Sequence, residues 1–350
     1  MLCPTLNELP PPPPDKTGWP WTEESPQLLG AMPDGKSWPK ISIVTPSYNQ
    51  GQYLEETIRS VLLQNYPNLE YIIIDGGSSD NSVEVIKKYE KWLSYWVSEP
   101  DRGQSHAINK GLKIVKGEII GWLNSDDVYM RGAISTAVEY LLSDHQIAMI
   151  YGDCTQTDNA SRKISYYKSE NYNRNTLIKW WRKSNYIPQP TVFLRKSVFN
   201  EVGYLNEKLR FCMDYDLWLR IGEKHLKIFY VPRAIANYRI TDTSKTGSQL
   251  PLFFHEFEEI SKRHWGKITS LGYLYYWFSY LMSFRKAAGY LGLAQLEWSE
   301  KRYVQARKYL LKSFLNGPFI IFKRNYISMS LRNLIGDKNV IKLKDIFVKK

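Results

Sequence analysis

The sequence predicts an α/β domain with a mostly parallel central sheet, followed by a helical C-terminal extension. Short apolar runs of strand length alternate with segments whose apolar residues recur at helical spacing. The strand-like runs are continuously apolar, which is typical of parallel strands covered on both faces. From about residue 251 the pattern is helical, basic and aromatic. The 350 residues, 43% of them hydrophobic, are enough for a large buried core.

Residues 1–39 are a proline-rich leader. Residues 10–14 are all proline, and further prolines follow as far as Pro39. This density of proline excludes helices and central strands. Trp19 and Trp21 are unusual in a solvated linker, so we expect them to hold an extended leader against the following domain.

The first two strand–helix units span residues 41–89. Residues 41–45 form a buried strand, a turn follows at 46–51, and apolar residues between 54 and 62 recur at helical spacing. The second strand, residues 71–74, ends at Asp75 in a turn rich in Gly and Ser, and a helix follows through Tyr89. This order predicts a parallel strand pair.

Two further units bring acidic residues to the same sheet edge. A strand at 95–97 ends at Asp101 and precedes a helix over 107–115, and a strand beginning near 117 runs into Asp126-Asp127, after which residues 128–131 lead into a helix. Carboxyl ends of parallel strands share one edge, outside which ligands bind. Each acid alone could be a solvated turn or a helix cap. Their repetition at successive strands indicates a ligand or a cation.

The pattern changes after residue 147. We expect a strand at 147–151, a polar hairpin at 155–167 with its tip at residues 158–159, and another strand at 189–194. A helix begins near Asp214. One of Asp214 and Asp216 suffices as its cap, which leaves the other for chemistry.

The C-terminal stretch from residue 251 carries most of the chain's charge. It holds 18 Lys and Arg against 7 Asp and Glu, a net charge of +11 out of the chain's +12. Residues 268–284 lack charge but are too short and polar for a convincing membrane span. Two interpretations stay open: helices that pack on the preceding α/β domain, or helices that lie on a membrane surface.

Composition and missing motifs exclude several kinds of ligand site. No Gly-rich dinucleotide or P-loop motif follows the first strand, and no His or Cys pair has zinc spacing. Carboxylates at strand ends suit Mn²⁺ or Mg²⁺ held together with ligand phosphates. Three unpaired cysteines and no signal peptide at the N-terminus lead us to expect a reduced, cytoplasmic setting.

Five motifs of the chain occur together in one known family. They are Pro46-Ser47-Tyr48-Asn49, Asp75-Gly76-Gly77-Ser78-Ser79-Asp80, Asp101-Arg102-Gly103, Asn109-Lys110-Gly111-Leu112 and Asn124-Ser125-Asp126-Asp127, with Gln189-Pro190 and Met213 to Trp218 extending the likeness. Together they resemble the family 2 glycosyltransferases of the GT-A fold. The resemblance covers roughly 200 of the 350 residues and implies a leader at 1–39, a GT-A domain at 40–248 and a basic helical extension at 249–350. The nucleotide-sugar half of the domain would be about 40–130 and its acceptor half about 131–248.

The resemblance implies roles position by position. Asp127 would bind the divalent metal, and Asp214 would be the general base of an inverting, hexosyltransferase-type enzyme. On the acceptor side we expect Gln189, Asp216 and Trp181, although Trp180-Trp181 could equally belong to the core. The implied nucleotide-sugar contacts are Pro46, Tyr48, Asn49, Asp75, Asp101, Arg102, Asn124 and Asp126.

Two departures leave the metal set open. Asn124 stands where the family has the first acid of its Asp-x-Asp pattern, and Thr241 and Asp242 occupy the region where the family often has a histidine. The third metal ligand therefore stays unassigned.

The resemblance implies sugar transfer from a nucleotide-diphosphate donor to a saccharide or lipid-linked acceptor, in polysaccharide or glycolipid biosynthesis. The donor base, UDP, GDP or dTDP, stays open. One alternative is a nucleotidyltransferase, although the loop at 48–52 has no basic residue. The other is a non-catalytic basic adaptor binding membrane or nucleic acid through residues 251–350. For the enzyme we expect no nucleic acid partner, and peripheral contact at the inner face of the plasma membrane is a hypothesis.

Overall fold

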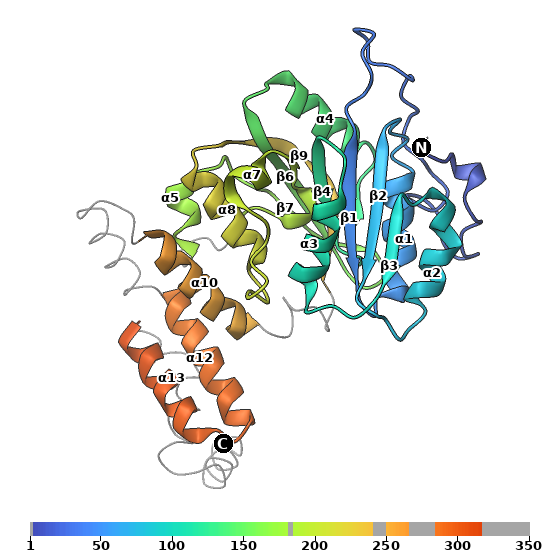
Figure 1. Ribbon diagram of the computed structural model, residues 1–350. Coiled ribbons are helices and arrows are strands. Elements are labelled where there is room, and N and C mark those ends of the chain that lie inside the picture. The colour runs from blue at the N-terminus through green and yellow to red at the C-terminus, as the bar shows by residue number, and fades with distance from the viewer. Residues whose placement is uncertain (1–2, 181–184, 241–249, 266–283, 317–350) are drawn as a thin grey trace. The chain divides into compact units, whose positions relative to one another are not determined.

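The computed structural model describes residues 3–180, 185–240, 250–265 and 284–316 (Figure 1). The chain divides into two compact units. The first comprises residues 1–173 and 185–241, and the second comprises residues 174–184 and 242–350.

One sheet runs through the first unit. Within the described residues its nine strands follow the order β3-β2-β1-β4-β8-β6-β9-β5, and β7 pairs with β6. The strands are β1 (Ile41–Ser47), β2 (Leu69–Asp75), β3 (Tyr95–Ser98), β4 (Ile119–Trp122), β5 (Val128–Tyr129), β6 (Ile147–Thr157), β7 (Lys163–Tyr167), β8 (Phe193–Arg195) and β9 (Lys227–Arg239).

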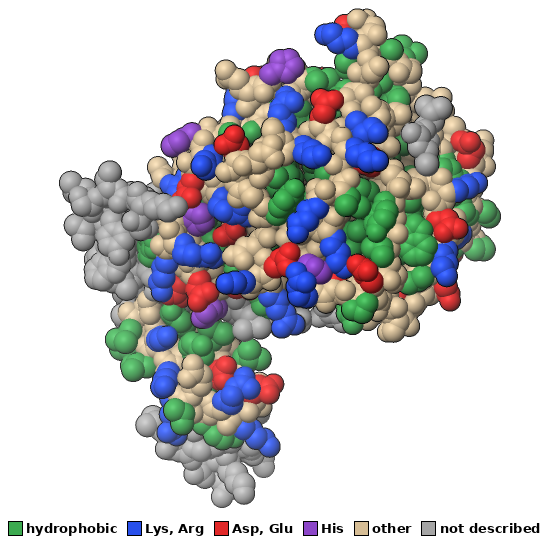
Figure 2. All heavy atoms as spheres, viewed as in Figure 1, with side chains coloured by type: hydrophobic (Ala, Val, Ile, Leu, Met, Phe, Trp, Pro, Cys, Tyr) green, Lys and Arg blue, Asp and Glu red, His purple; other side chains and the backbone are tan. Residues whose placement is uncertain are grey.

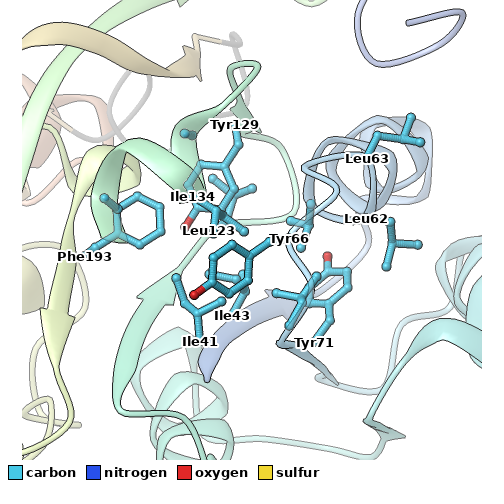
Figure 3. Packing of buried hydrophobic residues seen from close by; sticks show 14 of the residues in the cluster. Ile41, Ile43, Leu62, Leu63, Tyr66, Tyr71, Leu123, Tyr129, Ile134 and Phe193 are labelled. Atoms are coloured by element: carbon cyan, nitrogen blue, oxygen red, sulfur yellow. The ribbon is translucent and has the colours of Figure 1, made fainter. Parts of the chain in front are cut away.

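The four N-terminal strands are mutually parallel, as the continuous apolar runs predict. Alternate residues of β1 face opposite sides: Ile41 and Ile43 join one core, whereas Val44 lies against Gly111 of α3. Figure 3 shows Tyr66, Tyr71 and Tyr129 around the β1 side chains in this core. The helices of this unit are α1 (Gly51–Leu62), α2 (Ser82–Tyr89), α3 (Gln104–Ile114), α4 (Ala133–Ser143), α7 (Val198–Val202) and α8 (Met213–Glu223), with 3₁₀ turns at Leu6–Glu8, Glu90–Trp92 and Gln189–Thr191.

The relative direction of neighbouring strands changes in the second half of the sheet. β8 is antiparallel to both β4 and β6, while β6 and β9 are parallel. The predicted fold class is confirmed, and the sheet contains these antiparallel strand pairs beside its four parallel N-terminal strands. The hairpin predicted at 155–167 is confirmed, because β6 extends to Thr157 and pairs with β7.

Two local predictions need correction. Residues 128–129 do not lead directly into a helix but form β5, which pairs with β9. Residues 189–191 form a 3₁₀ turn, and the strand begins only at Phe193. Pro190 has no N–H to donate to a sheet ladder, which disfavours a strand there.

The leader is tied to the first unit through the predicted tryptophans. Trp19 Nε1 donates to the Tyr129 carbonyl at 2.7 Å. The buried Arg59 guanidinium, on α1, donates to the carbonyls of Pro10, Pro20 and Trp21 and lies 5.5 Å from the Trp21 ring centroid. The expected attachment of the leader through Trp19 and Trp21 is confirmed.

The second unit is helical where it is described. It contains α5 (Arg174–Leu177), α10 (Leu250–Trp265), α12 (Phe284–Ser299) and α13 (Tyr303–Asn316). α12 and α13 pack through Ala287, Leu291, Ala294 and Leu310. No helix among the described residues is long and apolar enough to cross a membrane. Nearly all of the uncharged stretch at 268–284 lies outside the described residues, as does the boundary predicted at 248.

Candidate active site

The ends of β1, β2 and β3 form one continuous rim. Ser47 is paired with Asp75, and Asp75 is paired with Ser98, so these strands end level with one another. β4 lies beside β1 and leads into Asp126-Asp127. The acidic residues predicted to share one sheet edge therefore follow neighbouring strands that end on the same side.

Asp75 is fully buried and held by four donors. Its carboxylate accepts from the Gly77 and Ser78 amides at 3.2 and 2.9 Å, from Ser78 Oγ at 2.6 Å and from Ser98 Oγ at 2.7 Å. Such a network fixes the carboxylate orientation before any ligand arrives.

Gly76 directly follows Asp75 and lies close to two more predicted residues, Asp101 and Tyr48. A Cβ on Gly76 would lie 2.4 Å from Asp101 Oδ2 and 3.3 Å from the Tyr48 ring. Tyr48 is 61% exposed although it directly follows a buried strand that includes Pro46. An exposed ring beside two carboxylates could stack on a planar base.

Asn49 and Arg102 have protein partners of their own. Asn49 has a positive φ of 51° and pins two turns together, because its amide donates to Ser78 Oγ and its side-chain oxygen accepts from the Ser79 amide. Arg102 is exposed and forms an ion pair with Glu207 at 2.7 Å. Asp101 Oδ1 accepts from the Gly103 amide at 2.6 Å, which fixes the Asp101-Arg102-Gly103 turn.

Asp127 is a buried carboxylate beside a second acid. The Arg239 amide donates to its Oδ1 at 3.0 Å and Asn124 Nδ2 to its Oδ2 at 3.2 Å. Thr57 Oγ1, on α1, donates to the carbonyls of Ser125 and Asp127. Burial, followed by the neighbouring charge of Asp126, raises the pKa of Asp127 well above its usual range. A cation would relieve both effects.

A chain of side-chain amides crosses the end of β4. Gln104 Nε2 donates to Asn124 Oδ1 at 2.8 Å, Asn124 Nδ2 donates to Gln189 Oε1 at 2.9 Å, and Gln189 Nε2 donates to the Trp122 carbonyl. The structure therefore brings Gln189, predicted on the acceptor side, into contact with Asn124.

Asp214 and Asp216 lie in the first turn of α8 in different environments. Asp214 is half-buried and accepts from Asn185 Nδ2 at 3.0 Å. Asp216 is buried and pairs with Arg220 at 2.8 Å, which places it in a structural ion pair. Trp218 of the same helix stacks on Trp122 at 5.6 Å, which anchors α8 beside β4. Trp181, Thr241 and Asp242 lie outside the described residues.

The donor set fits a hard cation that is shared with a ligand. No group of three or more His, Cys, Asp or Glu side chains is gathered for a metal among the described residues. Asp126 and Asp127 offer carboxylate oxygens, and Mg²⁺ is typically held by one or two carboxylates together with phosphate oxygens. These two residues therefore fit a divalent cation that binds along with a diphosphate.

Residues 42–203 match the family model described as Glycosyl transferase family 2. These residues form a domain of glycosyl transferase family 2. Among relatives, an uncharacterized glycosyltransferase of Rickettsia conorii is 32% identical over 187 residues, 52% of this chain and 31% of that protein. The chain thus spans about a third of the length of that relative. The putative teichuronic acid biosynthesis glycosyltransferase TuaG of Bacillus subtilis is 25% identical over 246 residues, 66% of this chain and 92% of that protein.

Solved structures of glycosyltransferases show the same fold. S. aureus TarS 1-349 in complex with UDP-GlcNAc has a TM-score of 0.56 at 15% identity, covering 85% of this chain and 92% of that one. The mannosyltransferase PcManGT from Pyrobaculum calidifontis, in complex with GDP-Man and Mn²⁺, has a TM-score of 0.50 at 15% identity, covering 85% and 88%. The predicted GT-A fold is confirmed.

Sequence reasoning missed two polar residues that contact candidate site residues. Asn185 contacts Asp214. Arg239, at the end of β9, contacts both Asp126 and Asp127. Arg239 ends a strand that also contains Lys227 and Arg233, so its charge alone was no signal, and no local signal marks Asn185.

Proposed function

We propose that the chain is an inverting, metal-dependent glycosyltransferase that moves a sugar from a nucleotide-diphosphate donor to an acceptor hydroxyl. The observation that carries the proposal is the gathering of Asp75, Asp101 and Asp126-Asp127 at one sheet edge of a family 2 domain. An acidic rim of this kind is suited to a nucleotide diphosphate that arrives with a cation.

The donor would lie along this rim. Asp75 would accept a base N–H while Tyr48 and Pro46 line the base and ribose, and Asn124 would hydrogen-bond the ribose. Asp101 and Arg102 would add a base or phosphate contact. Asp127, with Asp126 beside it, would hold Mn²⁺ or Mg²⁺, whose charge offsets that of the departing diphosphate.

Asp214 would remove the proton from the acceptor hydroxyl as the new bond forms. Asn185 fixes one of its oxygens by donating a hydrogen bond at 3.0 Å. One displacement inverts the anomeric centre, whereas retention needs a second nucleophile. Gln189, Trp181 and Asp216 would shape the acceptor side, directly or through their neighbours.

The biological setting we infer is polysaccharide or glycolipid biosynthesis. TuaG is named for teichuronic acid biosynthesis, and that relative matches the chain over 92% of its own length. The donors named with the solved structures, UDP-GlcNAc and GDP-Man, define the donor classes to try first.

Calorimetric titration with UDP, GDP and dTDP, each with and without Mn²⁺, tests the proposal. We expect one nucleotide to bind wild-type protein in a Mn²⁺-dependent way, and Asp127→Asn to remove that dependence. Asp144→Asn is the matched control, because Asp144 is a surface acid paired with Lys227. Absence of binding by all three nucleotides would refute the donor site and favour the basic adaptor.

We also propose peripheral contact of the C-terminal helices with an anionic membrane. On α13, Val304, Leu311 and Leu315 are 70%, 58% and 65% exposed. With the exposed Lys308 they follow the i, i+4, i+7, i+11 spacing of one helix face. Figure 2 shows apolar and basic side chains interspersed over α12 and α13. Such a face suits acyl chains flanked by anionic headgroups.

A further inference from the structure

Arg239 is an almost completely buried cation that faces the Asp126-Asp127 turn. Its side chain is 1% exposed, and its ion-pair partner Glu56, on α1, is 9% exposed, with 2.9 Å between Nη2 and Oε2. The guanidinium also lies 4.7 Å from the centroid of the Tyr53 ring. Burying a charge this deeply is costly unless every donor is satisfied.

Each nitrogen of Arg239 has a partner, and the partners come from three segments. Nε donates to the Asp126 carbonyl at 2.9 Å, and the backbone amide donates to Asp127 Oδ1 at 3.0 Å. Nη1 donates to the carbonyls of Asp158 and Asn159 and to Ser161 Oγ at 3.1, 3.3 and 2.9 Å. Arg239 therefore joins the acidic turn, the β6–β7 hairpin tip and α1.

Glu56 completes this junction from the other side. Ser161 Oγ lies 2.8 Å from both Glu56 carboxylate oxygens. Ser161 itself has a positive φ of 62°, a conformation that non-glycine residues seldom adopt. The hairpin tip is thus held in one geometry by the same ion pair that contacts the acidic turn.

A merely stabilising ion pair would not need to contact the acidic turn. Arg59 provides the comparison, since it is equally buried and packs over Trp21, but it donates to three leader carbonyls and to the Tyr89 hydroxyl and, within the described residues, makes no hydrogen bond to the acidic turn. The Arg239 side chain instead donates to the backbone carbonyl of Asp126, and its backbone amide donates to the carboxylate of Asp127, so the residue contacts both acids of the proposed cation site.

We propose that Arg239, locked by Glu56, is a positioning residue that holds Asp126 and Asp127 in the geometry needed for the cation and the diphosphate. This inference rests on the proposed function. Arg239 touches neither donor nor acceptor in this proposal; it acts through the orientation of the acidic turn. The planar guanidinium fork is essential, because a lysine cannot donate in three directions with fixed geometry.

The test compares Arg239→Lys and Glu56→Gln with Arg59→Lys. For each variant we would measure nucleotide affinity with and without Mn²⁺, using the nucleotide that binds wild-type protein, together with thermal unfolding. We expect Arg239→Lys and Glu56→Gln to weaken the Mn²⁺-dependent affinity roughly 10- to 100-fold, as loss of outer-shell support does. Binding without Mn²⁺ should be unchanged in both variants, because Asp75 is held by other donors.

Arg59→Lys should lower the unfolding temperature and leave the Mn²⁺ dependence of nucleotide binding intact. If Arg239→Lys and Glu56→Gln behave in the same way as Arg59→Lys, Arg239 has only a structural role and the inference is wrong. Should Arg239→Lys fail to fold, Glu56→Gln decides, since it keeps Arg239 and nearly the same shape. Failure of wild-type protein to bind any nucleotide would refute the proposed function instead.

Discussion

At the residue scale, the acids of the candidate site are held by residues that lie far away in the sequence. Asp75 ends one apolar run and the Asp126-Asp127 pair closely follows another, so their place at a strand end is local information. Arg239 contacts Glu56 across 183 positions and Asp127 across 112. Asn185 contacts Asp214 across 29. Pairings of this kind are set by the register of distant strands and helices, which no local pattern encodes.

Asp214 offers a prediction that separates chemistry from binding. Asp214→Asn keeps the shape of the side chain and removes its ability to accept a proton. We expect turnover of the donor to fall roughly 10²- to 10⁴-fold, the usual worth of a general base, with nucleotide affinity unchanged. Steady-state kinetics and calorimetry on the same protein would check this. A variant with normal turnover would show that another group takes the proton.

Gly76 offers a second prediction at this scale. In Gly76→Ala the new Cβ would lie 2.4 Å from Asp101 Oδ2, so the Asp101 side chain must move away from residue 76. Overpacking of this kind costs about 1–3 kcal/mol, and we expect most of it as weaker nucleotide binding measured by calorimetry. Gly30→Ala is the control, because nothing lies within 4 Å of its added Cβ. Equal affinity in both variants would contradict a base site at Gly76.

At the scale of elements, periodicity and apolar runs predicted the N-terminal half well. The four parallel strands and their helices lie where the sequence places them, and the runs of β1, β2 and β4 are buried throughout. β5 could not be predicted, since two residues form a strand only because β9 lies beside them. β8 starts only after Pro190, because proline has no N–H for a sheet hydrogen bond. The apolar run around it nevertheless suggested a strand from residue 189.

Close packing of α3 on β1 explains why residue 111 is a glycine. A Cβ on Gly111 would lie 2.4 Å from Val44 Cγ1, in the buried interface between helix and strand. We expect Gly111→Ala to lower the free energy of unfolding by about 1–3 kcal/mol in denaturant titrations. Combining it with Val44→Ala should cost less than the sum of the two single changes, because the second substitution makes room for the first. If the free-energy costs of the two substitutions were strictly additive, the strain in Gly111→Ala would not come from its contact with Val44.

At the scale of the whole molecule, the boundaries predicted at residues 39 and 248 stay predictions. The leader is integrated with the first unit through Arg59 and Trp19, so its composition alone says little about its independence. The distribution of net charge is a global property that can be counted directly from the sequence. Residues from 251 onward carry a net charge of +11, and this concentration governs which surfaces the chain can approach.

The outer face of α13 leads to a prediction about membranes. We expect the full chain to sediment with liposomes containing anionic lipid at low salt, and less so as salt rises, because exposed lysines each contribute about 1 kcal/mol near such a surface. Leu311→Ser with Leu315→Ser should weaken binding at every salt concentration, since roughly 1.5–3 kcal/mol is gained when one leucine is buried. Both side chains are exposed, so the fold should be unaffected.

Leu29→Ser is the matched control for the membrane prediction, because Leu29 is 78% exposed but lies in the leader of the first unit. It should leave liposome binding unchanged, whereas Lys308→Glu should weaken binding mainly at low salt. The two leucines test apolar insertion, and Lys308 tests electrostatic attraction. Salt-dependent binding that ignores the leucine changes would mean adsorption through charge alone. Wild-type protein that fails to bind at low salt would remove the membrane proposal and leave the proposed transfer reaction untouched.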